Sequence, residues 1–166
     1  MNIAVVTGNP KPASRTLDAA VNVATLLGGD PPSTVIDVIA LGPGLLGWGD
    51  PAVAVAVDAV QQSDVAVFAS PTYKATYTGL LKLFLDQFPS GGLTGVVAVP
   101  LMLGAGPGHA MAPDLLLKPV LVELGATCPT RGLYLLDSDT TSEAVLGPWL
   151  AAAIPQVRAL TQAVIH

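Results

Sequence analysis

The sequence predicts a doubly wound α/β fold with one five-stranded parallel sheet in the strand order 2-1-3-4-5. Five short apolar runs alternate with five segments of helical periodicity, which is the pattern of right-handed βαβ units. The runs are apolar at nearly every position, as expected for parallel strands buried on both faces. The length of 166 residues suits one domain, so we expect residues 1–166 to form a single unit.

The first βαβ unit begins with the apolar run at residues 2–7. Apolar side chains then recur at helical spacing from about Arg15, where Ser14 is a good N-cap and Gly28 provides the stop. A second strand is expected at residues 35–41.

A loop rich in glycine and proline, which contains Trp48, leads to the second helix. Asp50 followed by Pro51 is a typical helix start, with a capping residue before proline at the first helical position. Valine and alanine form the inner face of this helix up to Val60. The apolar run at residues 65–70 is expected to be the third strand.

The third helix is expected to begin at Thr78 and to end at Pro89, with its large apolar side chains on one face. Residues 95–101 follow as the fourth strand. Pro100 is expected near the end of this strand, because proline lacks the N–H group that a central strand uses for pairing.

Residues 113–124 predict a fourth helix that Pro119 bends, and residues 132–137 predict the fifth strand. A helical tail follows from about residue 142, where Thr140-x-x-Glu143 has the pattern of a capping box. Two prolines are expected to interrupt this tail, Pro148 and Pro155.

The composition excludes several classes of protein. With 51% hydrophobic and 11% charged residues the chain is not disordered. No apolar run reaches the roughly 18 residues of a membrane span, and no basic flank marks a signal peptide. The net charge of −5 argues against nucleic-acid binding. One cysteine, Cys128, and two histidines, His109 and His166, argue against disulfides and zinc. We therefore expect a cytoplasmic protein that binds neither membranes nor nucleic acids.

In this strand order, the loops after the first, third and fourth strands meet at the carboxyl edge of the sheet, where ligands bind. The first loop, residues 8–16, lacks the Walker pattern. It places Ser14, Arg15 and Thr16 at a helix N-terminus, which favours a phosphate monoester. The alternative is an ordinary capped helix with Arg15 in solvent.

The second loop, residues 71–79, holds two tyrosines, one lysine and three threonines. An aromatic wall with a few hydrogen-bonding groups suits a flat heteroaromatic ligand. The alternative is that Tyr73 and Tyr77 only cover the end of the sheet.

The third loop carries Gly104, Gly106 and Gly108, which allow the backbone to approach a ligand closely. Its spacing does not fit G-x-G-x-x-G, which argues against a Rossmann dinucleotide site. His109 either begins a helix or acts as a base, and the sequence identifies no partner that would orient it.

Other chemistries fit poorly. The chain has no G-x-S-x-G elbow, no H-E-x-x-H motif and no paired carboxylates. Cys128 is expected to be a small buried residue and not a nucleophile. We therefore expect no catalytic dyad and no metal site.

The stretch SPTYKATYTGLLK at residues 70–82, continuing to residue 86, resembles the signature of NAD(P)H-dependent FMN reductases of the flavodoxin-like superfamily. The resemblance is to the flavin reductases of alkanesulfonate monooxygenase systems. The phosphate-loop pattern within residues 8–16 and the run at residues 104–121 are similar to this family too. Together the three matches extend from residue 1 to about 137.

The resemblance implies a flavodoxin-like three-layer sandwich that binds FMN. It assigns Ser14, Arg15 and Thr16 to the phosphate, and the second and third loops to the two sides of the isoalloxazine ring. No catalytic side chain is implied, because hydride transfer is the chemistry of the cofactor. The implied cofactor-binding residues are Gly8, Pro10, Ser14, Arg15, Thr16, Pro71, Thr72, Tyr73, Lys74, Thr78, Gly104, Ala105, Gly106 and His109.

The implied reaction is hydride transfer from NADPH or NADH to flavin N5, with the electrons passed to free flavin or another small acceptor. Two alternatives stay open: an FMN-dependent quinone or azo-compound reductase, and a flavodoxin-type electron carrier that a partner protein reduces. The choice between NADH and NADPH is open, because no clamp for a 2′-phosphate is recognised.

One position departs from the family. Where the alkanesulfonate-linked reductases have an aromatic residue in the fourth helix, associated with the tetramer interface and flavin release, this chain has Leu115. Leucine favours a regular, well-packed helix, so we expect FMN to be retained and a monooxygenase partner to be doubtful. The low charge and a shallow cleft predict a closed, symmetric homo-oligomer, and the resemblance implies that it is a homodimer or homotetramer.

Overall fold

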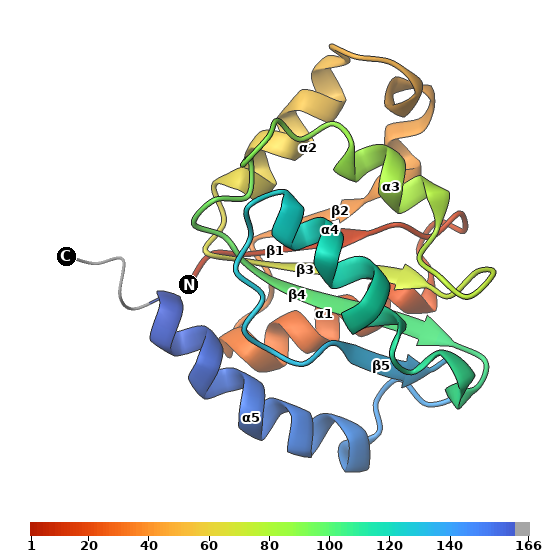
Figure 1. Cartoon of the computed structure of the whole chain (residues 1–166), viewed down its shortest axis with the longest axis vertical. Coiled ribbons are helices and arrows are strands. Elements are labelled where there is room, and N and C mark those ends of the chain that lie inside the picture. The colour runs from red at the N-terminus through yellow and green to blue at the C-terminus, as the bar shows by residue number, and fades with distance from the viewer. Residues whose placement is uncertain (162–166) are drawn as a thin grey trace.

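The computed structural model describes residues 1–161, so His166 and the end of the predicted tail lie outside the described residues. One five-stranded sheet has the order β2-β1-β3-β4-β5, and every pairing in it is parallel. Helices cover both faces (Figure 1). The predicted fold class and strand order are therefore confirmed.

The strands are β1 (Ile3–Thr7), β2 (Thr34–Asp37), β3 (Val65–Pro71), β4 (Val97–Gly104) and β5 (Leu133–Leu136). The α-helices are α1 (Arg15–Gly28), α2 (Pro51–Gln61), α3 (Gly79–Leu85), α4 (Lys118–Glu123) and α5 (Glu143–Thr161). The other helical segments are the 3-10 helices η1 (Val38–Leu46) and η2 (Pro107–His109) and the π-helix η3 (Pro113–Leu117).

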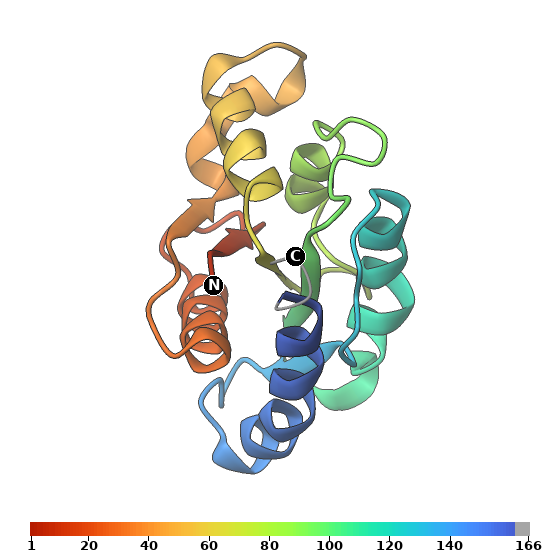
Figure 2. The ribbon, with the colours of Figure 1, turned by 90° about the vertical axis from the view of Figure 1, so that its left-hand side faces the viewer.

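Two apolar cores lie on the two faces of the sheet. Figure 2 shows in an end view the helices that cover these faces. Side chains of α2, α3 and α4 form one core with the alternate positions of the central strands. Side chains of α1 and α5 form the other with the remaining positions. Helices cover both faces, so β1, β3 and β4 are buried along their whole length, which is why their sequences are apolar at nearly every position.

The predicted helix caps are present. The Ser14 hydroxyl accepts from the Leu17 amide at 3.3 Å, and Asp50 accepts from the amides of Ala52 and Val53. The helix α1 includes Gly28 and stops one residue later than expected, at Gly29, whose φ of 90° is left-handed.

The second strand is shorter than predicted. We expected residues 35–41, but β2 ends at Asp37 and η1 follows. Asp37 pairs with Thr7, the last residue of β1, so no neighbouring strand remains for the chain to pair with. The apolar residues Val38 and Leu45 are buried instead beneath the helices of the α2 and α3 face.

Pro100 lies in the middle of β4 and not near its end. Even-numbered amides of β4 face the β5 side, since the Ala98 amide donates to the Thr127 carbonyl there. Pairing with β5 begins only at Leu101. The missing N–H of Pro100 therefore falls in a gap where no strand pairs, and the central position is tolerated.

The fourth helix is not regular. It begins with the π-helix η3, in which the Lys118 amide donates to the Pro113 carbonyl five residues back. Leu115 lies on this π turn and is 64% exposed. The expectation that Leu115 favours a regular, well-packed helix is wrong, and it no longer supports retention of FMN.

The limits of two other helices differ from expectation. The helix α3 ends at Leu85, and Phe88 packs from the following turn with its ring edge-on to Phe84 at 5.4 Å between centroids. The helix α5 begins at Glu143, which makes Ser142 the residue before the helix, so the predicted capping box from Thr140 is wrong. Two prolines lie inside α5 without ending it, Pro148 and Pro155.

None of the helices within residues 1–161 is long and apolar enough to cross a bilayer. Within the same residues, no three side chains of His, Cys, Asp or Glu are placed to hold a metal ion together.

Candidate functional site

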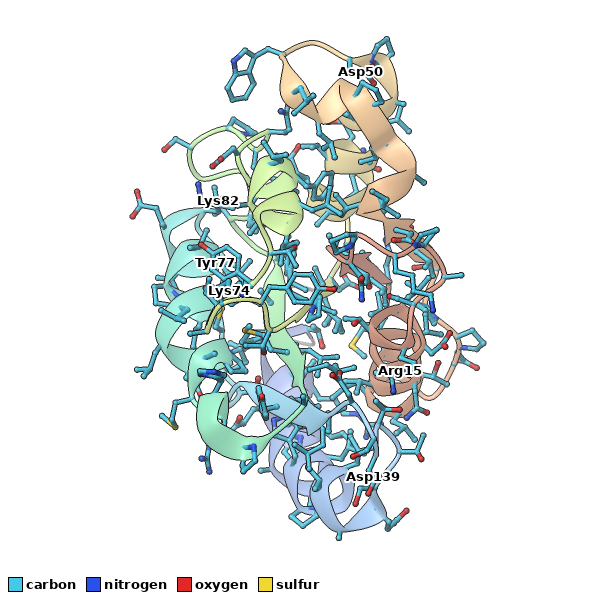
Figure 3. All side chains as sticks on the ribbon, turned by 90° about the vertical axis from the view of Figure 1, so that its right-hand side faces the viewer. Arg15, Asp50, Lys74, Tyr77, Lys82 and Asp139 are labelled. Atoms are coloured by element: carbon cyan, nitrogen blue, oxygen red, sulfur yellow. The ribbon has the colours of Figure 1, made fainter. Side chains whose placement is uncertain are left out.

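Three loops leave the carboxyl edge of the sheet side by side, after β1, β3 and β4. The Gly8 amide donates to the Ala69 carbonyl at 2.9 Å, and the Thr72 amide donates to the Leu103 carbonyl at 2.6 Å. These backbone bonds hold the starts of the loops together. Figure 3 looks at this edge, with Arg15 on one side and Lys74 and Tyr77 on the other.

The loop after β1 is shaped by two residues that the sequence did not single out. The Asn9 side chain accepts from the Lys11 amide at 3.0 Å and donates to the Thr16 hydroxyl at 2.9 Å. Asp37 accepts from the amide of Ala13, whose φ of 47° is left-handed. The motif Asn-Pro is a known turn former, so Asn9 could have been inferred, whereas Asp37 comes from another strand.

This loop presents donors at the start of α1. The amides of Arg15 and Thr16 lie in the first helical turn, where no earlier helical carbonyl can accept from them. The hydroxyls of Ser14 and Thr16 each accept one hydrogen bond within the protein, which leaves the proton of each hydroxyl to donate. Arg15 is exposed and donates to the Asp137 carbonyl at 2.8 Å. The arrangement suits a phosphate group.

Gly8 is needed for close packing between this loop and α3. A Cβ atom at Gly8 would overlap the side chain and backbone of Leu81. Thr78 lies below the loop, 4% exposed, and its hydroxyl donates to the Gly8 carbonyl at 2.6 Å and accepts from the Leu81 amide at 3.1 Å. The structure thus places Thr78 under the predicted site and not on its surface. Pro10, by contrast, is exposed on the loop.

The loop after β3 is a tight turn. Tyr73 and Thr76 exchange backbone hydrogen bonds at 2.9 and 3.2 Å, and the two residues between them, Lys74 and Ala75, have φ values of 51° and 72°. Consecutive positive φ values are typical of a type I′ turn and are strained for residues other than glycine. Pro71 is buried at the end of β3, while Tyr73 and Lys74 are exposed.

A buried hydroxyl lies between the second and third loops. The Oγ1 atom of Thr72 is inaccessible to solvent and has no hydrogen-bond partner within residues 1–161. It lies 3.5 Å from the position that a Cβ atom of Gly104 would occupy. The Thr7 hydroxyl, at the end of β1, likewise has no partner among the described residues. Buried hydroxyls without partners at a ligand edge fit a polar ligand that supplies the partner.

The loop after β4 is held by Tyr134, a residue of β5 that the sequence did not indicate. Its hydroxyl donates to the Gly106 carbonyl at 2.8 Å and fills the space where a side chain of Gly104 would lie. Ala105 is exposed beside it, and His109 is exposed in η2. Tyr134 therefore fixes the backbone of this loop, which is what the binding of a ligand edge by backbone groups requires.

Cys128 is partly buried against the core formed with α2, α3 and α4. Burial raises the pKa of the Cys128 thiol to about 11, and the Lys118 ammonium lowers it by less. The thiol is therefore protonated at neutral pH and is a poor nucleophile, as expected from the sequence.

Comparison with protein families gives one clear match. The family model described as NADPH-dependent FMN reductase matches residues 1–141. These residues include all three loops of the site.

Two curated proteins illustrate the similarity. FMN reductase (NADPH) of Escherichia coli K12 is 41% identical over 91 residues, which are 55% of this chain and 48% of that protein. The NADH-dependent FMN reductase SfnF of Pseudomonas putida is 35% identical over 78 residues, 47% of this chain and 42% of that protein. The chain spans about half the length of the curated relatives it matches.

Solved structures match over almost the whole chain. The apo form of NADH:FMN oxidoreductase (EMOB) superposes with a TM-score of 0.81 at 30% identity, covering 98% of this chain and 89% of that one. An oxidoreductase of Corynebacterium diphtheriae has a TM-score of 0.81 at 21% identity, covering 99% and 97%, and shows the shared fold.

Proposed function

Because this chain belongs to the NADPH-dependent FMN reductase family, we propose that it is an oxidoreductase that binds FMN and reduces it with NADPH or NADH. The observation that carries the proposal is the meeting of three loops at the carboxyl edge of the sheet, where the Thr72 hydroxyl, between the second and third loops, has no partner within residues 1–161. Such a site at the carboxyl edge of this sheet suits a ligand with a phosphate and a flat polar ring.

In this proposal the loop after β1 binds the FMN phosphate. Ser14 and Thr16 each keep a hydroxyl proton to donate, and the amides of the first turn of α1 point to the same place. Arg15 adds a charge-assisted contact. Gly8 and Pro10 shape this loop and do not provide donors, since Gly8 is packed against α3 and proline has no N–H.

The other two loops would hold the ring. Pro71, Thr72, Tyr73 and Lys74 would line one side, with the Thr72 hydroxyl donating to the ring edge. The backbone at Gly104, Ala105 and Gly106 would face the pyrimidine edge, and His109 would lie beside it. Thr78 would act from below by fixing the phosphate loop to α3.

When bound, FMN supplies the redox chemistry, since its N5 accepts a hydride from the nicotinamide. The chain would position the ring with one face open to the nucleotide. Tyr73 and Lys74 are exposed and would lie next to that face. Because the cofactor performs the hydride transfer, no side chain has to act as an acid or base, which agrees with the absence of a catalytic dyad in the sequence.

An anaerobic titration tests the proposal. Purified protein is loaded with FMN, NADPH is added without oxygen, and the flavin absorbance is followed. We expect rapid bleaching. A protein that binds FMN but shows no bleaching with NADPH or NADH would be an electron carrier that a partner protein reduces, and the proposal would be wrong.

We propose free flavin or a quinone as the small electron acceptor. A monooxygenase that takes up released reduced FMN is the alternative consumer. Gel filtration in excess NADPH under anaerobic conditions separates the two, because reduced flavin that elutes apart from the protein is available to a partner enzyme.

We further propose that the chain works in the cytoplasm as a homodimer or homotetramer. The single, partly buried Cys128 suits a reducing compartment. Exposed apolar side chains on η3, on α4 and in the turn before η3 favour assembly: Met111, Leu115, Leu116 and Val122.

A further inference from the structure

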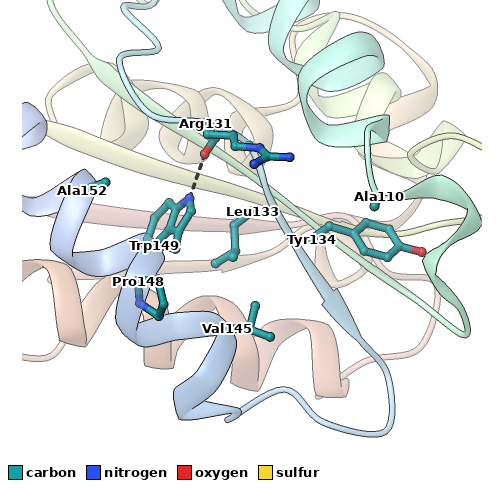
Figure 4. Close-up of a pocket in the computed structure, with 9 residues that line it drawn as sticks. Ala110, Arg131, Leu133, Tyr134, Val145, Pro148, Trp149 and Ala152 are labelled. Carbon is teal, nitrogen blue, oxygen red and sulfur yellow. Dashed lines mark hydrogen bonds between the residues drawn. The ribbon is translucent and has the colours of Figure 1, made fainter.

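A groove runs along the free edge of β5, and the residues that line it are other than those assigned to FMN. It is a cavity of about 420 Å³ between β5, α5 and the loop after β4. Figure 4 shows Arg131 and Trp149 at one end and Tyr134 and Ala110 at the other. Neither Arg131 nor Trp149 is among the residues proposed to bind FMN.

Trp149 provides a fixed aromatic surface in this groove. Its indole Nε1 donates to the Arg131 carbonyl at 2.8 Å, and one part of the ring packs against the core beneath α5. The side chain is half-buried, so another part of the ring is open to the groove. An anchored indole ring is a good platform for stacking a purine base.

Arg131 provides a positive charge next to this platform. Its side chain is exposed and has no hydrogen-bond or salt-bridge partner among residues 1–161. The charge of the nearby carboxylate, Asp114, is already paired, because this group binds the Lys118 ammonium at 3.2 Å and the Gly132 amide at 2.9 Å. A guanidinium group in this position suits a phosphate monoester.

The groove adjoins the ring-binding loops. Ala110 lines it and also lines a second cavity of about 280 Å³, which reaches Ala75 and His109 beside the proposed ring site. Tyr134 lines the groove and, through its hydroxyl, holds the Gly106 carbonyl. A ligand with one end over the ring can therefore extend along β5 toward Trp149.

We propose that this groove binds the 2′-phosphoadenosine half of NADPH, with the adenine stacked on Trp149 and the 2′-phosphate paired with Arg131. The inference rests on the proposed function, which places the nicotinamide over the flavin. It makes NADPH the preferred hydride donor, since NADH has no 2′-phosphate for Arg131 to bind.

A binding experiment tests the groove without flavin. The chain has two tryptophans, so Trp149 is the remaining fluorophore in a Trp48→Phe background. The protein is titrated with 2′,5′-ADP and, separately, with 5′-AMP, which lacks the 2′-phosphate. We expect both to quench Trp149, and 2′,5′-ADP to bind at least about tenfold more tightly.

Arg131→Ala should remove that difference, by weakening 2′,5′-ADP about tenfold or more while leaving 5′-AMP unchanged. Arg158→Ala is the matched control, since Arg158 is an exposed arginine on α5 that does not line the groove. No quenching by either nucleotide, or equal affinity for both in the unsubstituted protein, would overturn the proposal.

Kinetics separate this inference from the proposed function. With FMN bound, Arg131→Ala should raise KM for NADPH and leave KM for NADH and both kcat values unchanged. Flavin reduction in which Arg131→Ala affects neither nucleotide, or both equally, would overturn the groove and leave the proposed function intact. Arg131-dependent binding of 2′,5′-ADP without any flavin reduction would uphold the groove and overturn the function.

Discussion

Arg15 connects the phosphate loop at the start of α1 to the segment after β5. It follows the N-cap of α1, and its guanidinium donates to the Asp137 carbonyl in the segment after β5. That one bond uses a single donor and leaves the others of the guanidinium for a ligand. The residue is therefore held in place before a phosphate arrives, which lowers the entropy cost of binding.

Arg15→Ala should weaken FMN much more than riboflavin, because only FMN carries the phosphate. A charge-assisted contact is worth about 1.5–3 kcal/mol, which corresponds to roughly a ten- to 150-fold rise in Kd for FMN. Fluorescence titration with the two flavins measures this. An equal loss for both would contradict the assignment of Arg15 to the phosphate.

At the scale of elements, Thr78 links α3 to the phosphate loop. Its hydroxyl caps the helix through the Leu81 amide and also holds the Gly8 carbonyl of the loop after β1. The Thr78 amide in turn donates to the buried Ser70 hydroxyl at 2.9 Å. Strand, helix and loop are therefore connected at one buried point below the site.

Thr78→Ala should lower the free energy of unfolding by about 1–3 kcal/mol, since it removes a cap and leaves a buried carbonyl without its donor. Thr78→Ser keeps the hydroxyl and should recover most of the loss. Urea unfolding of both variants provides the measurement. If serine were as destabilising as alanine, the methyl group and not the hydroxyl would carry the effect.

Element η3 brings apolar side chains to the surface of the whole molecule. Leu115 and Leu116 are 64% and 40% exposed on the face that carries α2, α3 and α4. The chain has only 11% charged residues, so few side chains are available to keep such a face in water. A second copy of the chain could cover it in a closed, symmetric assembly.

A double variant with Leu115→Asp and Leu116→Asp should form a smaller species than the wild-type assembly, because the new carboxylates would have to be desolvated at the interface. Light scattering at micromolar concentration gives the mass. Leu26→Asp is the control, since Leu26 is an exposed leucine of α1 on the opposite face. A wild-type protein that is monomeric and fully active would contradict the prediction of a homo-oligomer.

The amino-acid sequence by itself determined the fold class, the strand order and the three loops that meet at the carboxyl edge of the sheet. This was possible because strands buried on both faces are apolar at nearly every position, and because helix starts such as Ser14 and Asp50 depend on residues close in the chain. The family resemblance is carried by the same local stretches, so it too could be read without coordinates.

Only the tertiary structure decided which side chains support these loops and where pairing stops. Asp37 and Tyr134 hold the first and third loops from other strands, so no local pattern indicates them. The strand β2 ends where β1 ends, and Pro100 is tolerated where no neighbour pairs. The Trp149 indole reaches the Arg131 carbonyl only because α5 packs beside the edge of β5. Each of these features depends on contacts between distant segments, which form only when the sheet is assembled.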